Sequence, residues 1–336
     1  MPPIQYGGIE RIVDLLARGL IARGHDVTLF ANPQSSAGSR LVPWPGPSSR
    51  SGIDSARNAL TLAKQAFEQD FDLVHSFSRV AYLTPLLPLS IPKLMTYQRE
   101  ITPRSVRWAH TLSRGTLWFS AISRSLMRHV ADIGTWRLTF NGVRMDSYQF
   151  RPEPGANAPL VFLGRVEEIK GPHIAIEVAR RAGLPLVIAG NVAPEHMAWF
   201  KMAIAPHIDG SHVSYIGAVD DVQKNALLGR ARALLMPVLW DEPFGIVMPE
   251  AMACGTPVIG LARGAIPEVV AHGQTGFVCQ TLDEMVAAVA RLPEIDRAAC
   301  RARTERLFSD RAIVDAYEAI YRDMLPVAGR SRAPQL

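Results

Sequence analysis

The chain has 336 residues, a length that suits two domains better than one. Its composition is 48% hydrophobic and 20% charged, and no run of about 18 apolar residues occurs, so we expect a large buried core and no transmembrane helix. The net charge of +5 fits nucleic acid, an anionic membrane surface or anionic small ligands. Because no basic block with interleaved aromatic residues occurs, we expect no nucleic-acid partner.

The start of the chain and its cysteines bear on the cellular compartment. No basic segment followed by an apolar stretch stands at the start, so we expect no signal peptide. Cys254, Cys279 and Cys300 are an odd number at scattered spacings, which favours a reducing compartment over a disulfide framework or a metal knuckle. We therefore expect a cytoplasmic protein.

In the first half, an amphipathic run predicts a helix over residues 8–23, and residues 37–54, rich in Ser, Gly and Pro, predict a long loop. Short apolar runs predict strands at residues 26–31, 72–77, 93–97, 117–122 and 137–140. In the second half, strands are predicted at residues 160–164, 185–190, 212–217, 233–237, 257–260 and 276–279. Helices are predicted at residues 172–182, 219–231, 282–292 and 312–325. This alternation indicates βαβ units with parallel sheets.

The alternation breaks once, at residues 151–159, where three prolines and a glycine indicate a linker. We therefore predict an α/β protein with two Rossmann-like, doubly wound domains, at residues 1–150 and 151–310, whose sheets face one another across a cleft. A C-terminal helix at 311–328 is expected to pack back toward the first domain, and the tail 329–336 to be disordered.

The most informative stretch runs from Trp240 to Gly260, WDEPFGIVMPEAMACGTPVIG. Pro249 lacks an N–H and must lie in the first turn of a helix, so the helix begins no earlier than about Ile246, and Gly255 ends it. The backbone N–H groups of residues 244–247 then point out of a helix N-terminus, which suits anions and hydroxyls. Glu242 and Glu250 suit paired hydroxyls of a polyol, but they also suit simple complementation of the helix dipole.

A second motif, Phe162-Leu-Gly-Arg-Val-Glu-Glu-Ile-Lys-Gly171, follows a predicted strand. Arg165 and Lys170 flank a short loop before a helix, so two cations are expected at the rim of the same sheet. They fit a diphosphate clamped without metal, and equally an ordinary pair of surface cations at a turn.

Taken together, the motifs resemble glycosyltransferase family 4. The resemblance rests on Gly-Arg-x4-Lys-Gly at residues 164–171, on Glu-Pro-Phe-Gly-x4-Glu at 242–250, and on Gly264-Ala-Ile-Pro-Glu268 followed by Phe277. Three ordered motifs are far more specific than a lone glycine loop. The resemblance spans nearly the whole chain and implies a retaining, nucleotide-sugar-dependent glycosyltransferase of GT-B fold, a hexosyltransferase with no cofactor and no metal.

The resemblance also implies roles for individual residues. Arg165 and Lys170 would hold the donor diphosphate and stabilise the departing nucleoside diphosphate. Glu242 would contact the sugar hydroxyls and Glu250 the ribose hydroxyls. The remaining donor-binding positions that it implies are Gly7, Gly8, Gly164, Gly190, Gly217, Phe244, Gly245, Ile246 and Val247.

The first half departs from the family in part. His75 ends a predicted strand, where a catalytic role and an ordinary half-buried histidine are equally well supported. Gln98 stands where many relatives carry a histidine near the sugar, and glutamine donates a hydrogen bond but cannot titrate.

Arginines are dense between residues 99 and 128, and Trp108 and Trp118 fall among them. Such a face suits an acidic or lipid-linked acceptor, or peripheral contact with the inner face of a membrane, although a solvated charged face is the simpler interpretation.

The stretch MPPIQYGGIE raises a question about the first domain. A Gly-Gly turn before a helix normally follows a strand, yet only six residues, two of them proline, precede Gly7. We therefore expect the first domain to lack its first strand here, and that strand to be encoded upstream of Met1. Alternatively, another segment fills the gap or the domain is degraded.

Three functions fit these observations. The first is the retaining glycosyltransferase, and the second is another GT-B enzyme such as a nucleotide-sugar epimerase, against which the Glu-x7-Glu spacing argues. The third is a non-catalytic nucleotide-sugar-binding protein. The sequence specifies neither the nucleotide, the sugar nor the acceptor.

Overall fold

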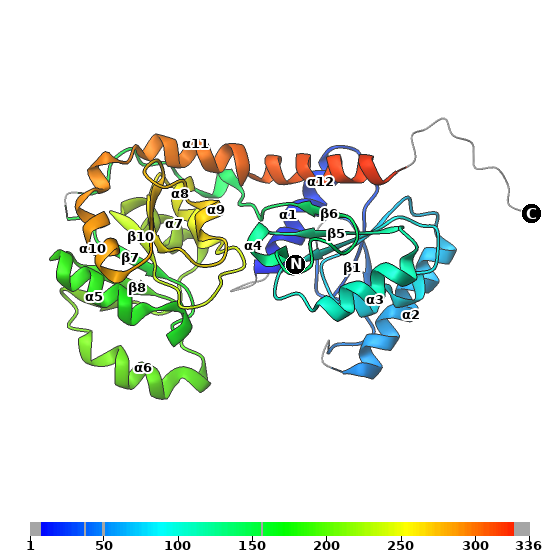
Figure 1. Cartoon of the computed structure of the whole chain (residues 1–336), viewed down its shortest axis with the longest axis horizontal. Coiled ribbons are helices and arrows are strands. Elements are labelled where there is room, and N and C mark those ends of the chain that lie inside the picture. Colours follow the sequence, from blue (N-terminus) through cyan, green and yellow to red (C-terminus); the bar gives the residue numbers. More distant parts are fainter. Residues whose placement is uncertain (1–7, 37, 49–50, 156, 326–336) are drawn as a thin grey trace, which may run out of the picture. The chain divides into compact units, whose positions relative to one another are not determined.

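The computed structural model describes residues 8–36, 38–48, 51–155 and 157–325, and it divides the chain into two compact units. The first unit contains the chain up to Phe140 together with the chain from Ile313 onward, and the second is Asn141–Ala312. Each is an α/β unit built on parallel strands, as the sequence predicted (Figure 1).

The first unit contains two parallel sheets. The smaller sheet pairs β1 (Thr28–Ala31) with β2 (Arg40–Pro43). The larger one has the order β3-β4-β5-β6, with bounds Val74–Ser76, Lys93–Tyr97, Leu117–Ala121 and Trp136–Leu138. The helices of this unit are α1 (Gly8–Ala22), α2 (Gly52–Glu68), the 3-10 helix η1 (Val80–Leu86), α3 (Pro103–Ser113) and α4 (Arg124–Met127).

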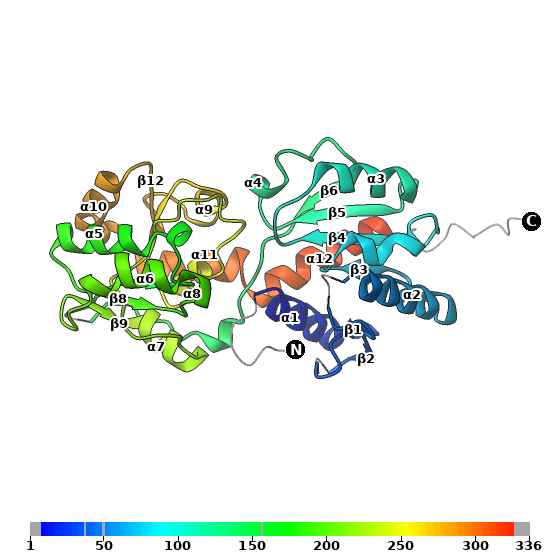
Figure 2. The ribbon, with the colours of Figure 1, turned by 90° about the horizontal axis from the view of Figure 1, so that it is seen from below.

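Alternation along β4 separates two cores in this unit. Met95 and Tyr97 face a cluster that α2, η1 and α3 cover, whereas Leu94 faces α1 and the last helix, α12 (Asp310–Met324). Successive side chains of a strand point to opposite faces, so one buried strand supports helix layers on both sides (Figure 2).

Among the residues that the structure describes, the two sheets of the first unit are not joined by a central strand, whereas the strands of the second unit form one sheet. In the second unit, the first strand lies in the middle of the sheet, and in the described part of the first unit no strand pairs with both β1 and β3. The predicted absence of a first strand concerns residues 1–7, which lie outside the described residues.

The second unit contains a six-stranded parallel sheet with the order β12-β11-β10-β7-β8-β9. Its strands are β7 (Leu160–Leu163), β8 (Leu186–Ala189), β9 (Val213–Tyr215), β10 (Ala233–Met236), β11 (Val258–Leu261) and β12 (Gly276–Cys279). Its α-helices are α5 (Pro172–Ala182), α6 (Met197–Ala203), α7 (Asp221–Arg230), α8 (Val247–Ala253), α9 (Ile266–Val269), α10 (Leu282–Ala290) and α11 (Arg297–Leu307). Its 3-10 helices are η2 (Met145–Ser147), η3 (Glu168–Lys170), η4 (Pro194–His196), η5 (Ala205–His207) and η6 (Leu292–Glu294).

The boundary between the units differs from the one that the proline-rich segment indicates. The second unit begins at Asn141. Residues ahead of the prolines already bond to this unit, since the Tyr148 hydroxyl donates to Glu250 and the Arg151 N–H donates to the carbonyl of Cys254. Composition showed a break in regular structure, but the contacts place that break inside the second unit.

The prediction of one long loop over residues 37–54 was wrong in part. Strand β2 lies within it, held by parallel pairing with β1, and α2 begins at Gly52 with the Ser51 side chain accepting a hydrogen bond from the Asp54 N–H. The predicted disorder of 329–336 falls outside the described residues. Among those described, no helix has the length and apolar character that crossing a membrane requires.

Candidate active site

The carboxyl end of β10 carries the central part of the candidate site. Helix α8 starts after Ile246, has Pro249 in its first turn, and is followed by Gly255, as the sequence predicted. Just before it, Glu242 is 7% exposed, so its carboxylate is held in a place where water screens charge poorly.

Lys170 meets Glu242 although 72 residues separate them in the chain. The ammonium donates to Glu242 Oε2 at 2.6 Å, and the Trp240 indole N–H donates to the same oxygen at 3.0 Å. The ammonium also lies 4.6 Å from the centre of the Trp240 ring. Among the described residues, both hydrogen bonds to this carboxylate go to Oε2, which leaves Oε1 for a ligand hydroxyl.

Glu250, within α8, has a parallel arrangement. It is 4% exposed, and its Oε1 accepts from the Tyr148 hydroxyl at 2.7 Å and from the Lys224 ammonium at 2.5 Å. Burial and the neighbouring Glu250 carboxylate raise the pKa of Tyr148, so the phenol stays protonated and donates. In the described part of the chain, Oε2 of Glu250 takes no protein hydrogen bond, so each glutamate presents one uncommitted oxygen.

Arg165 does not share a partner with Lys170. Its guanidinium lies 2.9 Å from the buried carboxylate of Glu167, and His196 contacts the other oxygen of that carboxylate at 3.1 Å. The Arg165 side chain is 43% exposed, so it can turn toward a ligand, but the two cations are not pre-formed as one clamp.

Backbone contacts tie the motifs together at the carboxyl edge of the sheet. The Ala265 N–H donates to the carbonyl of Glu242 at 2.8 Å, and the Leu239 N–H donates to that of Ile169 at 2.8 Å. A Cβ on Gly264 would stand 2.2 Å from the Glu242 carbonyl oxygen and 2.3 Å from its nitrogen. The motif that begins at Gly264 therefore fixes the backbone at Glu242, the acid of the Glu-Pro-Phe-Gly motif.

The other predicted glycines of this unit lie at strand ends. Gly164 follows β7 and Gly190 follows β8, and a Cβ on Gly190 would meet the Gly164 carbonyl oxygen at 1.7 Å. Gly217 lies beyond β9, and its carbonyl accepts from the Gly190 N–H at 2.7 Å. Phe244 is 2% exposed and packs in the core, while Gly245, Ile246 and Val247 form the half-buried turn into α8.

In the first unit, His75 is the middle residue of β3, and both of its ring nitrogens are occupied. They exchange hydrogen bonds of 2.7 Å with the hydroxyls of Tyr321 and Thr96, and the Phe77 and Tyr317 rings pack beside it. Burial lowers the pKa of His75 to about 3. A histidine so engaged and neutral favours the packing and positioning interpretation of the two that the sequence left open, and a catalytic role stays a prediction.

The low pKa of His75 predicts a pH dependence of stability. The pKa lies below the ordinary value of 6.5, so between about pH 3 and 6.5 the unfolded chain binds one proton more than the folded protein. His75 therefore lowers the free energy of unfolding as pH falls through this window, by about 1.4 kcal/mol per pH unit. Urea unfolding at two pH values inside it should show a smaller fall for His75→Gln than for the wild type. An equal fall in both proteins would contradict this assignment.

Two more predicted positions belong to the first unit. Gln98 is half-buried and directly follows β4. Gly8 is the first residue of α1, and an added Cβ there would meet no atom of the described residues within 4 Å; Gly7 lies outside the described residues. Within the described part of the chain, no group of three or more His, Cys, Asp or Glu residues is arranged to hold a metal ion.

Three residues of this site were not predicted from the sequence: Trp240, Tyr148 and Lys224. Trp240 stands two residues before Glu242, so its place in the motif was a signal that could have been used. Tyr148 and Lys224 carry no such signal, because each reaches Glu250 only through the fold.

Comparison with known proteins identifies the class to which this fold and site belong. Residues 148–305 match the family model described as glycosyl transferases group 1, and residues 6–133 match that of glycosyltransferase family 4. The structure is similar to a glycosyltransferase involved in avilamycin A biosynthesis, with 25% identity, a TM-score of 0.72, and coverage of 97% of this chain and 93% of that one. It is also similar to a glycosyltransferase from Rickettsia africae, with 18% identity, a TM-score of 0.79 and 96% of each chain covered. Two Rossmann-like units with these neighbours define a glycosyltransferase of the GT-B fold.

The chain belongs to glycosyltransferase family 4. A glycogen synthase from Mycobacterium tuberculosis is 29% identical to it over 92% of this chain and 88% of its own. A phosphatidyl-myo-inositol mannosyltransferase from Propionibacterium freudenreichii is 28% identical over 93% of this chain and 88% of its own.

Proposed function

We propose that this glycosyltransferase moves a hexose from a nucleoside-diphosphate sugar to an acceptor, with retention at the anomeric carbon and without a metal ion. The observation that carries the proposal is the pair of buried glutamates at the carboxyl edge of one sheet. Each commits one oxygen to the protein, Glu242 to Lys170 and Glu250 to Lys224, and the other oxygen of each is uncommitted among the residues that the structure describes. Neutral polyols with adjacent hydroxyls, such as a sugar and a ribose, suit two such acceptors.

Lys170 is the cation for the leaving group. As the bond between the sugar and the phosphate breaks, negative charge grows on the diphosphate and positive charge on the anomeric carbon. A preplaced ammonium stabilises the diphosphate, and the nearby Glu242 carboxylate favours the sugar cation. Arg165, half-exposed beside Lys170 in the sequence motif, would turn from Glu167 to a second phosphate oxygen.

The remaining predicted residues would line the donor site. Gly164, Gly190 and Gly217 would bring backbone close to the nucleotide, and the turn from Phe244 to Val247 would offer N–H groups to the sugar and phosphate. One structural neighbour, from Anabaena, was solved with UDP and glucose. The relatives are named for different acceptors, glycogen and phosphatidyl-myo-inositol.

The proposal predicts transfer that survives a chelator, because the protein's own cations neutralise the leaving diphosphate. A thermal-shift screen of nucleoside-diphosphate sugars identifies the donor, since a ligand that binds the native state raises its melting temperature. Transfer from that donor to a panel of sugar and lipid acceptors is then measured with and without EDTA. Equal rates are expected. Complete loss that added Mg²⁺ restores would contradict the metal-independent mechanism.

A further inference from the structure

Helix α2 of the first unit exposes an apolar stripe. Ile53, Leu60 and Phe67 are 69%, 65% and 72% exposed, and their spacing of seven residues places them along one side of the helix. The opposite side, with Leu62 and Ala63, is buried in the core. Three large apolar side chains exposed in line are unusual for a surface that stays in water.

Two cations stand between these apolar residues on the same side. Arg57 and Lys64 follow Ile53 and Leu60 by four residues, and their side chains are 62% and 71% exposed. The acids that face them are Asp54, at 3.7 Å from Arg57, and Glu68, at 3.6 Å from Lys64. Such long, exposed contacts hold a side chain weakly, so both cations are available to another partner.

Helix α3 extends this surface. Helices α2, η1 and α3 all pack on one core cluster, so they form one layer whose outer faces point away from the sheet. On α3, Trp108 and Leu112 are 43% and 41% exposed. Arg104 and Arg107 are also exposed, and the helix contains no acid. Of the twelve most exposed large apolar side chains in the described residues, five lie on this layer.

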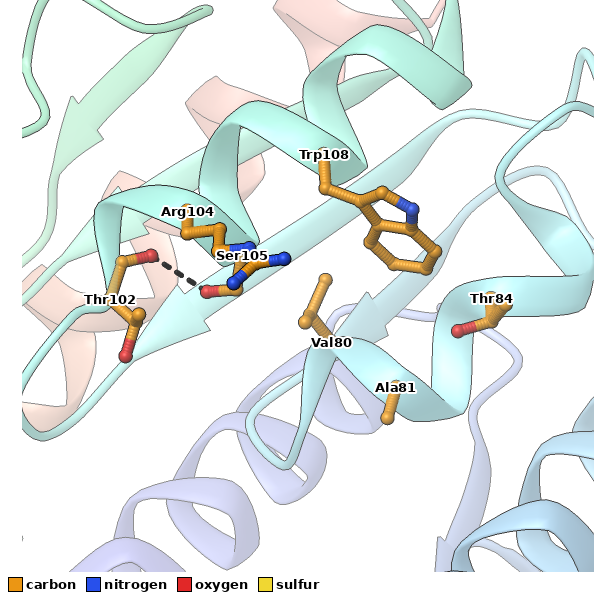
Figure 3. A pocket seen from close by; sticks show the side chains of 7 residues that line it. All are labelled: Val80, Ala81, Thr84, Thr102, Arg104, Ser105 and Trp108. Atoms are coloured by element: carbon orange, nitrogen blue, oxygen red, sulfur yellow. Dashed lines mark hydrogen bonds between the residues drawn. The ribbon is translucent and has the colours of Figure 1, made fainter.

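An open cavity of about 370 Å³ lies in the seam between η1 and α3. Val80, Ala81 and Thr84 of η1 line one side, and Trp108 projects over it from α3 (Figure 3). The Ser105 hydroxyl bonds to the Thr102 carbonyl at 2.7 Å, so it is turned to its own backbone. The cavity therefore adds apolar surface beside the tryptophan.

We propose that the outer surface of the α2, η1 and α3 layer docks this protein onto an anionic phospholipid bilayer. The apolar side chains would enter the boundary between headgroups and acyl chains, Trp108 would sit at headgroup level, and the cations would meet lipid phosphates. Charge complementarity favours this occupant over a second copy of the chain. If the α2 stripes of two copies packed together about a two-fold axis, Arg57 and Lys64 of one copy would lie near Arg57 and Lys64 of the other, and these like charges would repel.

Vesicle sedimentation tests this proposal with the full chain. Vesicles of phosphatidylcholine with phosphatidylglycerol are compared with vesicles of phosphatidylcholine alone. The wild type should bind the anionic vesicles and lose binding at high salt. The triple variant Ile53→Ser, Leu60→Ser, Phe67→Ser should bind at least about tenfold more weakly, and Arg57→Gln with Lys64→Gln should remove most of the preference for anionic lipid.

Met202 and Val222 of the second unit, 73% and 79% exposed, provide the matched control. Changing both to serine removes equally exposed apolar surface outside the layer and should leave vesicle binding unchanged. Circular dichroism checks that each variant is folded, which is expected because the replaced side chains lie outside the core. Three results would overturn the proposal: no binding by the wild type, undiminished binding by the triple variant, or a triple variant that instead loses a concentration-dependent dimer.

Discussion

Replacing Glu242 with glutamine, or Lys170 with methionine, is expected to lower sugar transfer by about 10²- to 10³-fold while the protein stays folded. The two side chains form a 2.6 Å ion pair whose members are only 10% and 15% exposed. Under the proposed function, glutamine keeps the size of the side chain but loses the charge that would lie next to the anomeric carbon, and methionine loses the cation that would stabilise the leaving diphosphate. The rate constant for transfer at saturating donor is the measurement.

The same replacements should also cost stability, by about 3 kcal/mol each, since each leaves its partner as an unpaired charge away from water. The double variant should be more stable than the two single losses added together, because no charge is then left alone. Arg181 and Asp283 form a 2.7 Å pair on the surface of the same unit, and Arg181→Gln should change neither rate nor stability measurably. Transfer that persists in both single site variants would refute the assignment of this pair.

Gly264→Ala is expected to lower both transfer and stability, the latter by about 2–4 kcal/mol, although Gly264 contributes no side chain to the site. Its φ is +57°, which strains any other residue, and its added methyl would collide with both backbone polar atoms of Glu242. Relief of that collision must move the backbone that holds the carboxylate against Lys170. The variant is measured by urea unfolding and by transfer rate.

Gly183→Ala isolates the collision from the backbone strain. Gly183 has a similar φ of +65°, and a Cβ there would meet no atom of the described part of the chain within 4 Å. It should therefore lose only about 1 kcal/mol and no activity. If Gly264→Ala behaved like this control, the third motif would not position Glu242 as described.

Much of the fold could be predicted from the sequence because its strands are short, buried and bounded by turn residues. Strands β4 and β12 were predicted to the residue, and Pro249 with Gly255 fixed the position of α8. Strand β2 could not be predicted in this way, because its two end residues, Arg40 and Pro43, are exposed and the strand therefore lacks a buried apolar run. Its parallel pairing with β1 orders it instead.

The candidate site was less accessible to sequence reasoning. Glu242, Glu250, Lys170 and Arg165 were each expected at the edge of one sheet, but which cation pairs with which acid depends on side-chain packing. Lys224, which no sequence motif indicated, pairs with Glu250, and Glu167 rather than Lys170 accompanies Arg165. His75 was ambiguous because the sequence does not reveal that Tyr321, from the far end of the chain, reaches its ring.

The most direct test of the proposed function is proton NMR of the protein incubated with the nucleotide sugar that the thermal-shift screen selects, in the absence of an acceptor. Water then serves as the acceptor, and the anomeric signal reports both cleavage and the configuration of the sugar first released. We expect slow loss of the donor signal, release of the nucleoside diphosphate, and first appearance of the sugar in the anomeric configuration of the donor, with none of this in Glu242→Gln. Binding without turnover, in this assay and with every acceptor offered, would contradict the account, as would first release of the opposite anomer.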